Sequence, residues 1–219
     1  MSKITKKVYP VMGMHCAACA NNVEKIVKKQ EGVEDASVNL AAAVLTVDFN
    51  SDVVSPEQLK DAVMKIGFDL IIDEDNSMEE QEEAEHSYYE QLQRKTVVAW
   101  IFALPVAFMG MFFMDFPGIN WWMLVLSLPV LFYSGHAFYV NAWKQAKHFT
   151  SNMDTLVALS TSIAFLFSLF NTLYPQFWYE QGLEPHVYYE AATVIIAFVL
   201  VGKLMEEKAK GKTSMAIRK

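Results

Sequence analysis

The chain has 219 residues, of which 53% are hydrophobic, and its formal net charge is −7. This length accommodates one or two domains. The basic residues form no stripe interleaved with aromatic residues, so the sequence gives no indication of nucleic-acid binding. The first thirty residues are polar and rich in lysine, which is unlike a secretory signal peptide. Long apolar stretches begin only after residue 95, and we therefore expect a soluble half followed by a membrane half.

The first seventy or so residues alternate between strand-like and helix-like patterns. Ser55 and Pro56 mark the N-cap and the first position of a helix, and Gly67 marks its end. We expect strands at about 5–12, 33–40, 43–49 and 68–72, and helices at about 17–30 and 55–66. The order βαββαβ predicts an α+β, ferredoxin-like sandwich in which two helices cover one face of an antiparallel sheet.

The only two cysteines, Cys16 and Cys19, lie in one Cys-x-x-Cys turn between the first strand and the first helix. A helix N-terminus stabilises thiolates, and two soft thiolates suit a soft cation such as Cu(I). A disulfide is disfavoured because so short a loop constrains little chain. A closed zinc site needs four ligands, and only His15 is a nearby third candidate. A thioredoxin-like redox pair remains the open alternative.

The two halves are joined by an acidic segment that runs from Asp73 to Glu85. This run has no glycine, proline or apolar periodicity. We expect a domain at 1–73, followed by an acidic linker at 74–95 that is solvated or begins a helix.

Four apolar stretches are long enough to cross a hydrocarbon core of roughly 30 Å as helices. The predicted all-α membrane domain covers 96–207, with spans at about 96–114, 121–139, 155–174 and 187–205. The loops 115–120 and 175–186 contain no Lys or Arg, so the positive-inside rule places the N-terminal domain in the cytosol.

The second span is followed by an amphipathic stretch. Glycine is a reasonable kink point, and Gly135 interrupts the span just before this stretch. We expect an interfacial helix at about 136–148, although a plain basic helix end at the membrane is the alternative. The expected lipid-facing residues are Phe138, Ala142 and Trp143, and the expected water-facing residues are Lys144 and Lys147.

Three residues of the membrane half suggest chemistry. Glu190 and Glu206 lie near opposite ends of the fourth span, and carboxylates at membrane depth by default indicate a function. Met153 lies at the start of the third span. The patterns by themselves leave open that Met153 is a packing residue, and that Glu206 and Glu207 are solvated and paired with lysines one turn away, such as Lys203.

Residues 4–72 resemble a heavy-metal-associated domain, the fold of copper chaperones and of the cytosolic ends of heavy-metal P-type ATPases. The resemblance is carried by Gly13-Met14-x-Cys16-x-x-Cys19, Glu31-Gly32-Val33, Ser37-Val38-Asn39-Leu40 and Gly67-Phe68. It implies that Cys16 and Cys19 are Cu(I) ligands, that Met14 is a core anchor rather than a ligand, and that Phe68 packs near the loop. Position 15 is commonly threonine in the family. We expect the histidine found here to face solvent.

Residues 134–163 and 187–218 resemble the leading membrane helices of copper-transporting P-type ATPases. The carrying motifs include Asn152-Met153-Asp154-Thr155, Tyr189-Glu190-Ala191 and Gly202-Lys203-x-x-Glu206. The resemblance implies that Met153 and Glu206 take Cu(I) from the cytosol and that Glu190 lies on the release path. It also implies that Gly135, Lys144 and Lys147 belong to a docking platform for a cytosolic copper chaperone or for the N-terminal domain. The family usually has two glycines at this kink, and this chain has only Gly135.

The resemblance as a whole implies the N-terminal portion of a copper-exporting, multi-pass ATPase of the plasma membrane. The phosphorylation motif Asp-Lys-Thr-Gly-Thr is absent, so we expect ATP and Mg to act only in a longer parent pump, and leave open whether this chain is an enzyme. Residues 208–219 are expected to start the connection to an actuator domain. The expected partners are copper, membrane lipid and the actuator, phosphorylation and nucleotide-binding domains. The alternatives are a free-standing membrane-tethered metal-binding protein and a pump for Ag(I) or another soft ion.

Overall fold

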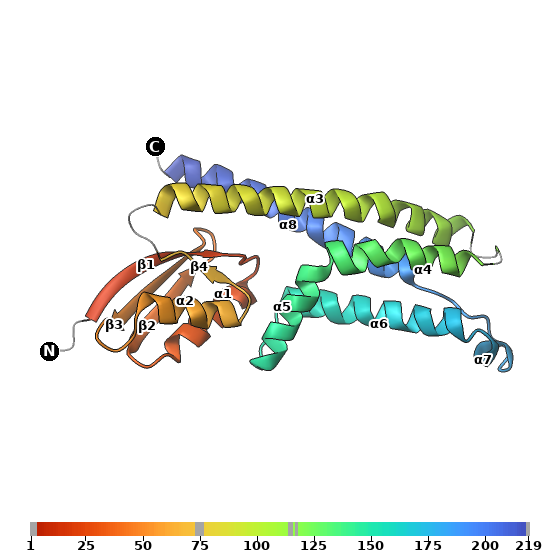
Figure 1. Ribbon diagram of the computed structural model, residues 1–219, viewed down its shortest axis with the longest axis horizontal. Coiled ribbons are helices and arrows are strands. Elements are labelled where there is room, and N and C mark those ends of the chain that lie inside the picture. The colour runs from red at the N-terminus through yellow and green to blue at the C-terminus, as the bar shows by residue number, and fades with distance from the viewer. Residues whose placement is uncertain (1–3, 73–76, 114–115, 117, 218–219) are drawn as a thin grey trace. The chain divides into compact units, whose positions relative to one another are not determined.

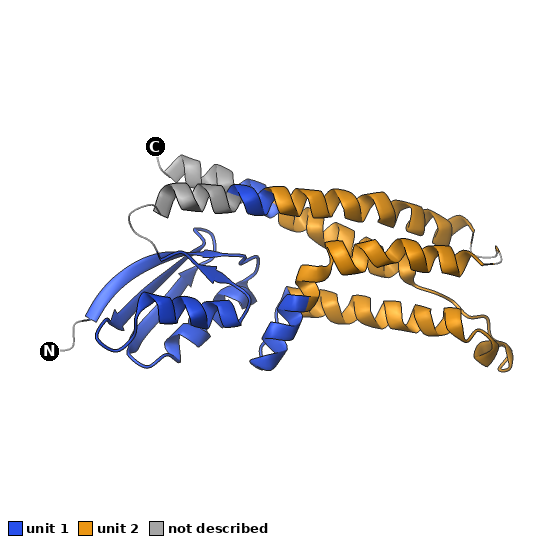
Figure 2. Ribbon diagram, viewed as in Figure 1, with its two compact units in different colours: residues 1–89, 140–153, 206–219 blue, residues 90–139, 154–205 orange. Residues whose placement is uncertain are grey.

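The computed structural model describes residues 4–72, 77–113, 116 and 118–217, and Figure 1 shows their helices and strands. The side chains of residues 77–85 and 210–217 are outside this description. The chain divides into two compact units (Figure 2). The first unit comprises residues 1–89, 140–153 and 206–219, and the second comprises residues 90–139 and 154–205.

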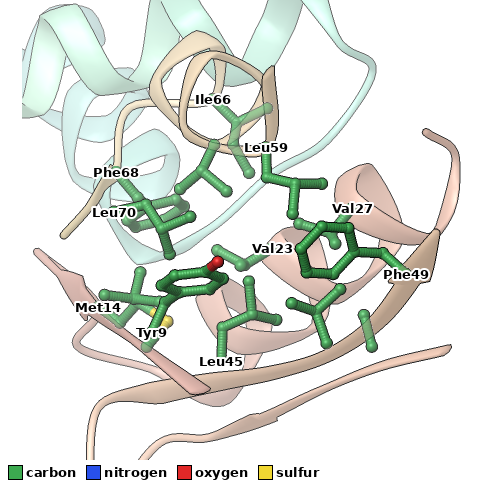
Figure 3. Close-up of a cluster of buried hydrophobic side chains, with 14 of the residues drawn as sticks. Tyr9, Met14, Val23, Val27, Leu45, Phe49, Leu59, Ile66, Phe68 and Leu70 are labelled. Atoms are coloured by element: carbon green, nitrogen blue, oxygen red, sulfur yellow. The ribbon is translucent and has the colours of Figure 1, made fainter. Parts of the chain in front are cut away.

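The N-terminal part of the first unit is a four-stranded antiparallel sheet with two helices on one face (Figures 1 and 3). Its strands follow the spatial order β2-β3-β1-β4. The elements are β1 (Ile4–Met12), α1 (Ala17–Lys28), β2 (Val33–Asn39), β3 (Val44–Asn50), α2 (Pro56–Lys65) and β4 (Asp69–Leu70). The predicted βαββαβ order and the ferredoxin-like fold are confirmed.

A hydrophobic core lies between the sheet and the two helices (Figure 3). In β3, Leu45, Val47 and Phe49 are buried and alternate with partly exposed residues, as expected for a strand with one covered face. The α1 helix contributes Val23 and Val27, which are one turn apart and fully buried. The core cluster takes all its buried members from residues 9–70, so the sheet and its helices form their own core.

Seven helical segments account for most of the remaining described residues. They are α3 (Ser77–Phe112), α4 (Ile119–Pro129), η1 (Val130–Ser134), α5 (His136–Lys147), α6 (Met153–Leu173), α7 (Gln176–Tyr179) and α8 (Tyr189–Ile217). Residues 77–95 of the expected linker at 74–95 form the first half of α3, which was one of the two expectations for this acidic segment, and residues 73–76 lie outside the described residues. Glu, Gln and Lys are good helix formers, and acidic residues are favourable at a helix N-terminus.

Two helices are long and apolar enough to cross a membrane, namely His86–Phe112 and Met153–Leu173. A third span results if the bent pair Ile119–Ser134 and His136–Lys147 counts as one. Within the described residues, the prediction of four spans is therefore not confirmed. The predicted fourth span lies in α8, where Glu190, Lys203 and Glu206 interrupt the apolar sequence.

The predicted kink before α5 is confirmed, with a bend of 59° between the two helical segments. The η1 segment is a turn of π-helix, and the N–H of Gly135 donates to the carbonyl of Val130 (2.8 Å). A β-carbon at Gly135 would lie 2.8 Å from the carbonyl oxygen of Leu131, so only glycine fits. Ser134 donates from its buried hydroxyl to the Lys95 carbonyl (2.9 Å) and joins η1 to α3.

Candidate metal-binding loop and transport residues

The Cys-x-x-Cys turn forms the N-terminus of α1. Cys16 is the N-cap residue with an extended backbone, and its Sγ accepts a hydrogen bond from the N–H of Cys19 (3.3 Å). Its carbonyl also accepts from the N–H groups of Cys19 and Ala20. Cys16 is partly exposed, Cys19 is buried, and both are free thiols. The loop thus presents two sulfur donors held in place by the first turn of a helix.

Gly13 and Met14, which precede the two cysteines, fix the backbone turn and the core packing of the loop. Gly13 has a φ of +85°, a conformation that glycine adopts without strain, and it turns the chain from β1 toward α1. Met14 is 1% exposed and its side chain lies in the core (Figure 3). The ring of Phe68 reaches within 3.8 Å of the point where a side chain on Gly13 would begin. The interpretation of Met14 as a core residue and the packing of Phe68 near the loop are both confirmed.

His15 does not face solvent as predicted, because its side chain is only 3% exposed. Its Nδ1 atom lies 3.2 Å from Oε2 of Glu206 and 3.4 Å from Oε1 of Glu207. Nδ1 is the donor to an ionised carboxylate, which can only accept hydrogen bonds. On the other side of the ring, Nε2 is hydrogen-bonded to the hydroxyl of Tyr88 (3.0 Å). No local pattern indicates these partners, because Glu206 lies 191 residues away along the chain.

Met153 is the first residue of α6 and is half-buried. The amide nitrogen of the preceding residue, Asn152, lies 3.9 Å from Sγ of Cys19. Within the first unit, the loop therefore makes one contact with a predicted transport residue and one beside another. His15 contacts Glu206, whose side chain is partly exposed, and Cys19 contacts Asn152, the neighbour of Met153.

A buried ion pair joins α6 to α8 in the second unit. Nζ of Lys203 donates to Oδ1 of Asp154 (2.7 Å), and both side chains are more than nine-tenths buried. The same Nζ lies 4.7 Å from the centre of the Phe138 ring, a cation–π contact. The expected pairing of Lys203 with the glutamates of its own helix is thus replaced by a partner on α6. A lysine in an apolar stretch is the signal that indicates such a hidden partner.

The prediction that Phe138 lies on the lipid-facing side of the amphipathic helix is wrong. The Phe138 side chain is 1% exposed, so it packs inside the second unit rather than facing lipid. Trp143 is exposed as predicted, and Lys147 is exposed with its Nζ 5.6 Å from the Trp143 ring centre. Lys144 is half-buried, and its Cδ lies 3.6 Å from the point where a side chain on Gly67 would begin.

Glu190 lies in the first turn of α8, sixteen residues before Glu206. Its Oε2 atom is buried and has no hydrogen-bond partner among the described residues. A side chain on Gly110 would meet both Glu190 and the methyl group of Met123, each at 3.2 Å. Met123 is fully buried, so a thioether side chain and a carboxylate border the same glycine of α3. Sequence reasoning missed Met123, because methionines in apolar helices are common packing residues.

Among the residues that the structure describes, no group of three or more His, Cys, Asp and Glu side chains is arranged to hold a metal ion. The sulfur donors of the Cys-x-x-Cys turn are therefore the candidate ligands here. Two thiolates match the preference of Cu(I) for few, soft ligands.

Comparison with known proteins agrees with this arrangement. Residues 8–69 match the heavy-metal-associated domain family. The chain is 39% identical to the probable copper-transporting ATPase PacS of Synechococcus elongatus, over 98% of this chain and 30% of that protein. It is 33% identical to the copper-exporting P-type ATPase of Staphylococcus saprophyticus, over 94% of this chain and 26% of that protein. The chain thus spans under a third of the length of these relatives.

Among solved structures, the N-terminal domain of a potential copper-translocating P-type ATPase from Bacillus subtilis, in the Cu(I)-loaded state, is 43% identical. That match covers 32% of this chain and 86% of that chain, with a TM-score of 0.31. The CopZ metallochaperone is 31% identical over 31% of this chain and its own full length, with a TM-score of 0.30. The chain therefore carries a heavy-metal-associated domain followed by helices similar in sequence to those of copper-transporting P-type ATPases.

Proposed function

We propose that this chain is the N-terminal portion of an ATP-driven Cu(I) export pump and that Cys16 and Cys19 bind Cu(I). The observation that carries the proposal is the pair of free thiols at the start of α1, in a heavy-metal-associated domain that shares one chain with membrane-length helices. Two cysteines at such a turn supply the soft donors that Cu(I) prefers. The similarity of nearly the whole chain to copper-transporting ATPases supports the same assignment.

The transport path begins at Met153 and Glu206 in this proposal. The Met153 thioether belongs to the residue after Asn152, which contacts Cys19 of the copper-binding loop. The partly exposed carboxylate of Glu206 contacts His15 of the same loop. Glu190 lies toward the release end, where its buried and unpartnered oxygen is suited to a passing cation. Met123 is a second, sulfur-bearing residue at that place.

The remaining parts of the function belong to the longer protein. ATP and Mg act in the phosphorylation and nucleotide-binding domains, to which residues 208–219 lead through an actuator domain. The N-terminal domain lies in the cytosol and the helices lie in the plasma membrane, because the lysines and arginines cluster on one side of the predicted spans. A cytosolic copper chaperone, or the N-terminal domain, docks near Gly135, Lys144 and Lys147, where the half-buried Lys144 and the exposed Lys147 follow the kink.

A Cu(I) titration of the purified chain tests the proposal. With a chromophoric Cu(I) chelator as competitor, we expect one tightly bound Cu(I) per chain, and none in the Cys16→Ser, Cys19→Ser double variant. The matched control is Ser37→Ala, which leaves both thiols in place. Preferential, tight Zn(II) binding would contradict the proposal. A measurable thiol–disulfide exchange activity without Cu(I) binding would favour the redox alternative, and equal affinity for Ag(I) would widen the substrate to soft monovalent ions.

A further inference from the structure

Figure 2 colours the first unit, within which the heavy-metal-associated domain and its copper-binding loop contact two distant segments of the chain. One is the segment 140–153, which contains most of α5 and leads into α6. The other is the part of α8 that begins at Glu206. Among the described residues, His15 of the loop contacts α8, and its ring lies between Tyr88 on one side and Glu206 and Glu207 on the other.

The contact with the segment 140–153 is made by polar groups that fit one another closely. Gln145 is completely buried, and its Nε2 donates to the carbonyl of Ile66 (2.7 Å) at the end of α2. Its Oε1 accepts from Nδ2 of Asn22 (3.1 Å), on α1. The same Asn22 amide donates to the carbonyl of Ser151 (3.3 Å). A buried amide whose two ends are both satisfied by the domain indicates a specific surface rather than an incidental contact.

The position of His15 makes this surface specific. Its Nδ1 lies within 3.4 Å of two carboxylates, and its side chain is almost fully shielded from water. A polar side chain shielded from water needs hydrogen-bond partners, and these carboxylates and Tyr88 supply them. Threonine, the residue common at this position in the family, is too short to reach across in the same way.

We propose that His15 is the docking residue of the copper-binding loop, and that its partner is the Glu206–Glu207 pair of the same chain. The inference rests on the proposed function, in which Glu206 is the carboxylate that accepts copper. Docking through His15 places Cys19 beside Asn152, the residue before Met153. The loop that holds the cargo and both proposed acceptor residues then lie in one contact surface.

Hydrogen–deuterium exchange of the full 219-residue chain in lipid nanodiscs tests docking without any transport assay. The readout is the exchange of backbone amides in residues 140–153, which lie outside the heavy-metal-associated domain. In His15→Thr we expect exchange there to become about tenfold faster, which corresponds to losing roughly 1.4 kcal/mol of docking free energy. The matched control is His186→Thr, at an exposed histidine outside this surface, and it should exchange like the wild type.

A second variant distinguishes loss of docking from local unfolding of the loop. Glu207→Gln removes a charged partner of His15 from α8 and leaves the domain untouched, so it should raise exchange in 140–153 by itself. Combined with His15→Thr it should add nothing further, because both changes break one contact. Exchange within twofold of the wild type in both single variants would overturn the proposal. One Cu(I) bound per chain in those variants would then leave the proposed function standing, whereas absent Cu(I) binding in the wild type would count against that function alone.

Discussion

Met14 lies two residues before Cys16 and carries a soft sulfur, so its chemistry alone would suit Cu(I). Its burial assigns it a different role. The side chain is 1% exposed and packs among Tyr9, Phe68 and Leu70 in the core (Figure 3). Methionine fills irregular gaps in a core because its side chain is unbranched and flexible. At this position it supports the loop from the side opposite to solvent.

This role predicts that volume matters at position 14 and sulfur does not. Met14→Leu should cost less than about 1.5 kcal/mol of the free energy of unfolding, whereas Met14→Ala should cost about 2–5 kcal/mol. Urea denaturation of residues 1–75, which contain the whole core cluster, measures both values. Cu(I) affinity should stay within about twofold of the wild type in Met14→Leu. Loss of Cu(I) binding in that variant would instead make Met14 a ligand.

Gly135 is a second residue whose type is dictated by its surroundings. The π-helical turn before it brings the carbonyl oxygens of Val130 and Leu131 to the space that a side chain would need. The bend of 59° occurs with one glycine at this place. The preceding Ser134 adds no backbone flexibility, because its hydroxyl is hydrogen-bonded to a carbonyl of α3. Sequence reasoning found this kink because glycine in an apolar helix is a visible local signal.

At the scale of helices, the pair of Asp154 and Lys203 holds α6 against α8. Asp154 lies in the first turn of α6, where a negative charge is favoured by the helix dipole. Lys203 reaches it from α8 and also covers the ring of Phe138. The pair lies one residue after Met153 and three residues before Glu206. We infer that it sets the spacing of the two helix segments that carry these proposed transport residues.

Removing one member of the ion pair should lower the free energy of unfolding far more than replacing both members with apolar residues. Lys203→Met leaves a buried carboxylate without its partner, and we expect it to lower the free energy of unfolding in detergent by about 3–5 kcal/mol. The double variant Asp154→Leu, Lys203→Met should recover most of that loss, because an apolar pair needs no desolvation of charge. Lys208→Met, at an exposed residue of the same helix, is the control. Equal losses in the single and double variants would show that the ion pair is not the interaction that matters.

At the scale of the whole molecule, the chain combines a folded metal-binding domain with helices of which only some are long and apolar enough to cross a membrane. Among the described residues, two helices meet both conditions, and a bent pair of helices would be a third span. In α8, charged residues occur within the apolar stretch. Such residues are expensive in lipid unless they face protein or a polar path, so their presence in α8 agrees with a role in ion movement.

A longer protein that contains this chain offers the test of the proposed transport path. In membrane vesicles that contain the full-length protein, Glu206→Ala should reduce ATP-driven copper uptake at least about tenfold, the loss typical of removing a charged group from a transport or reaction path. Copper binding to the Cys-x-x-Cys loop should remain at one Cu(I). Glu180→Ala, at an exposed glutamate after α7, should transport normally. Unchanged transport in the Glu206 variant would remove that residue from the pathway.

Local patterns in the sequence determined the βαββαβ order, the position of the two thiols at a helix start and the kink at Gly135. Each of these depends on residues within one or two turns of each other, where periodicity, caps and glycine act directly. The core position of Met14 was implied only by the family resemblance. For the acidic run, local patterns left open a solvated segment or a helix start, and the structure joins residues 77–95 to the following apolar residues in α3.

Only the tertiary structure decided which distant side chains meet. The partners of His15 lie 191 and 192 residues away, and Lys203 pairs with a residue 49 positions earlier. Phe138, which is far from Lys203 along the chain, contacts that same lysine. Hydrogen bonds and ion pairs of this kind require two surfaces to come together, and the spacing of residues along the chain carries no record of which surfaces those are.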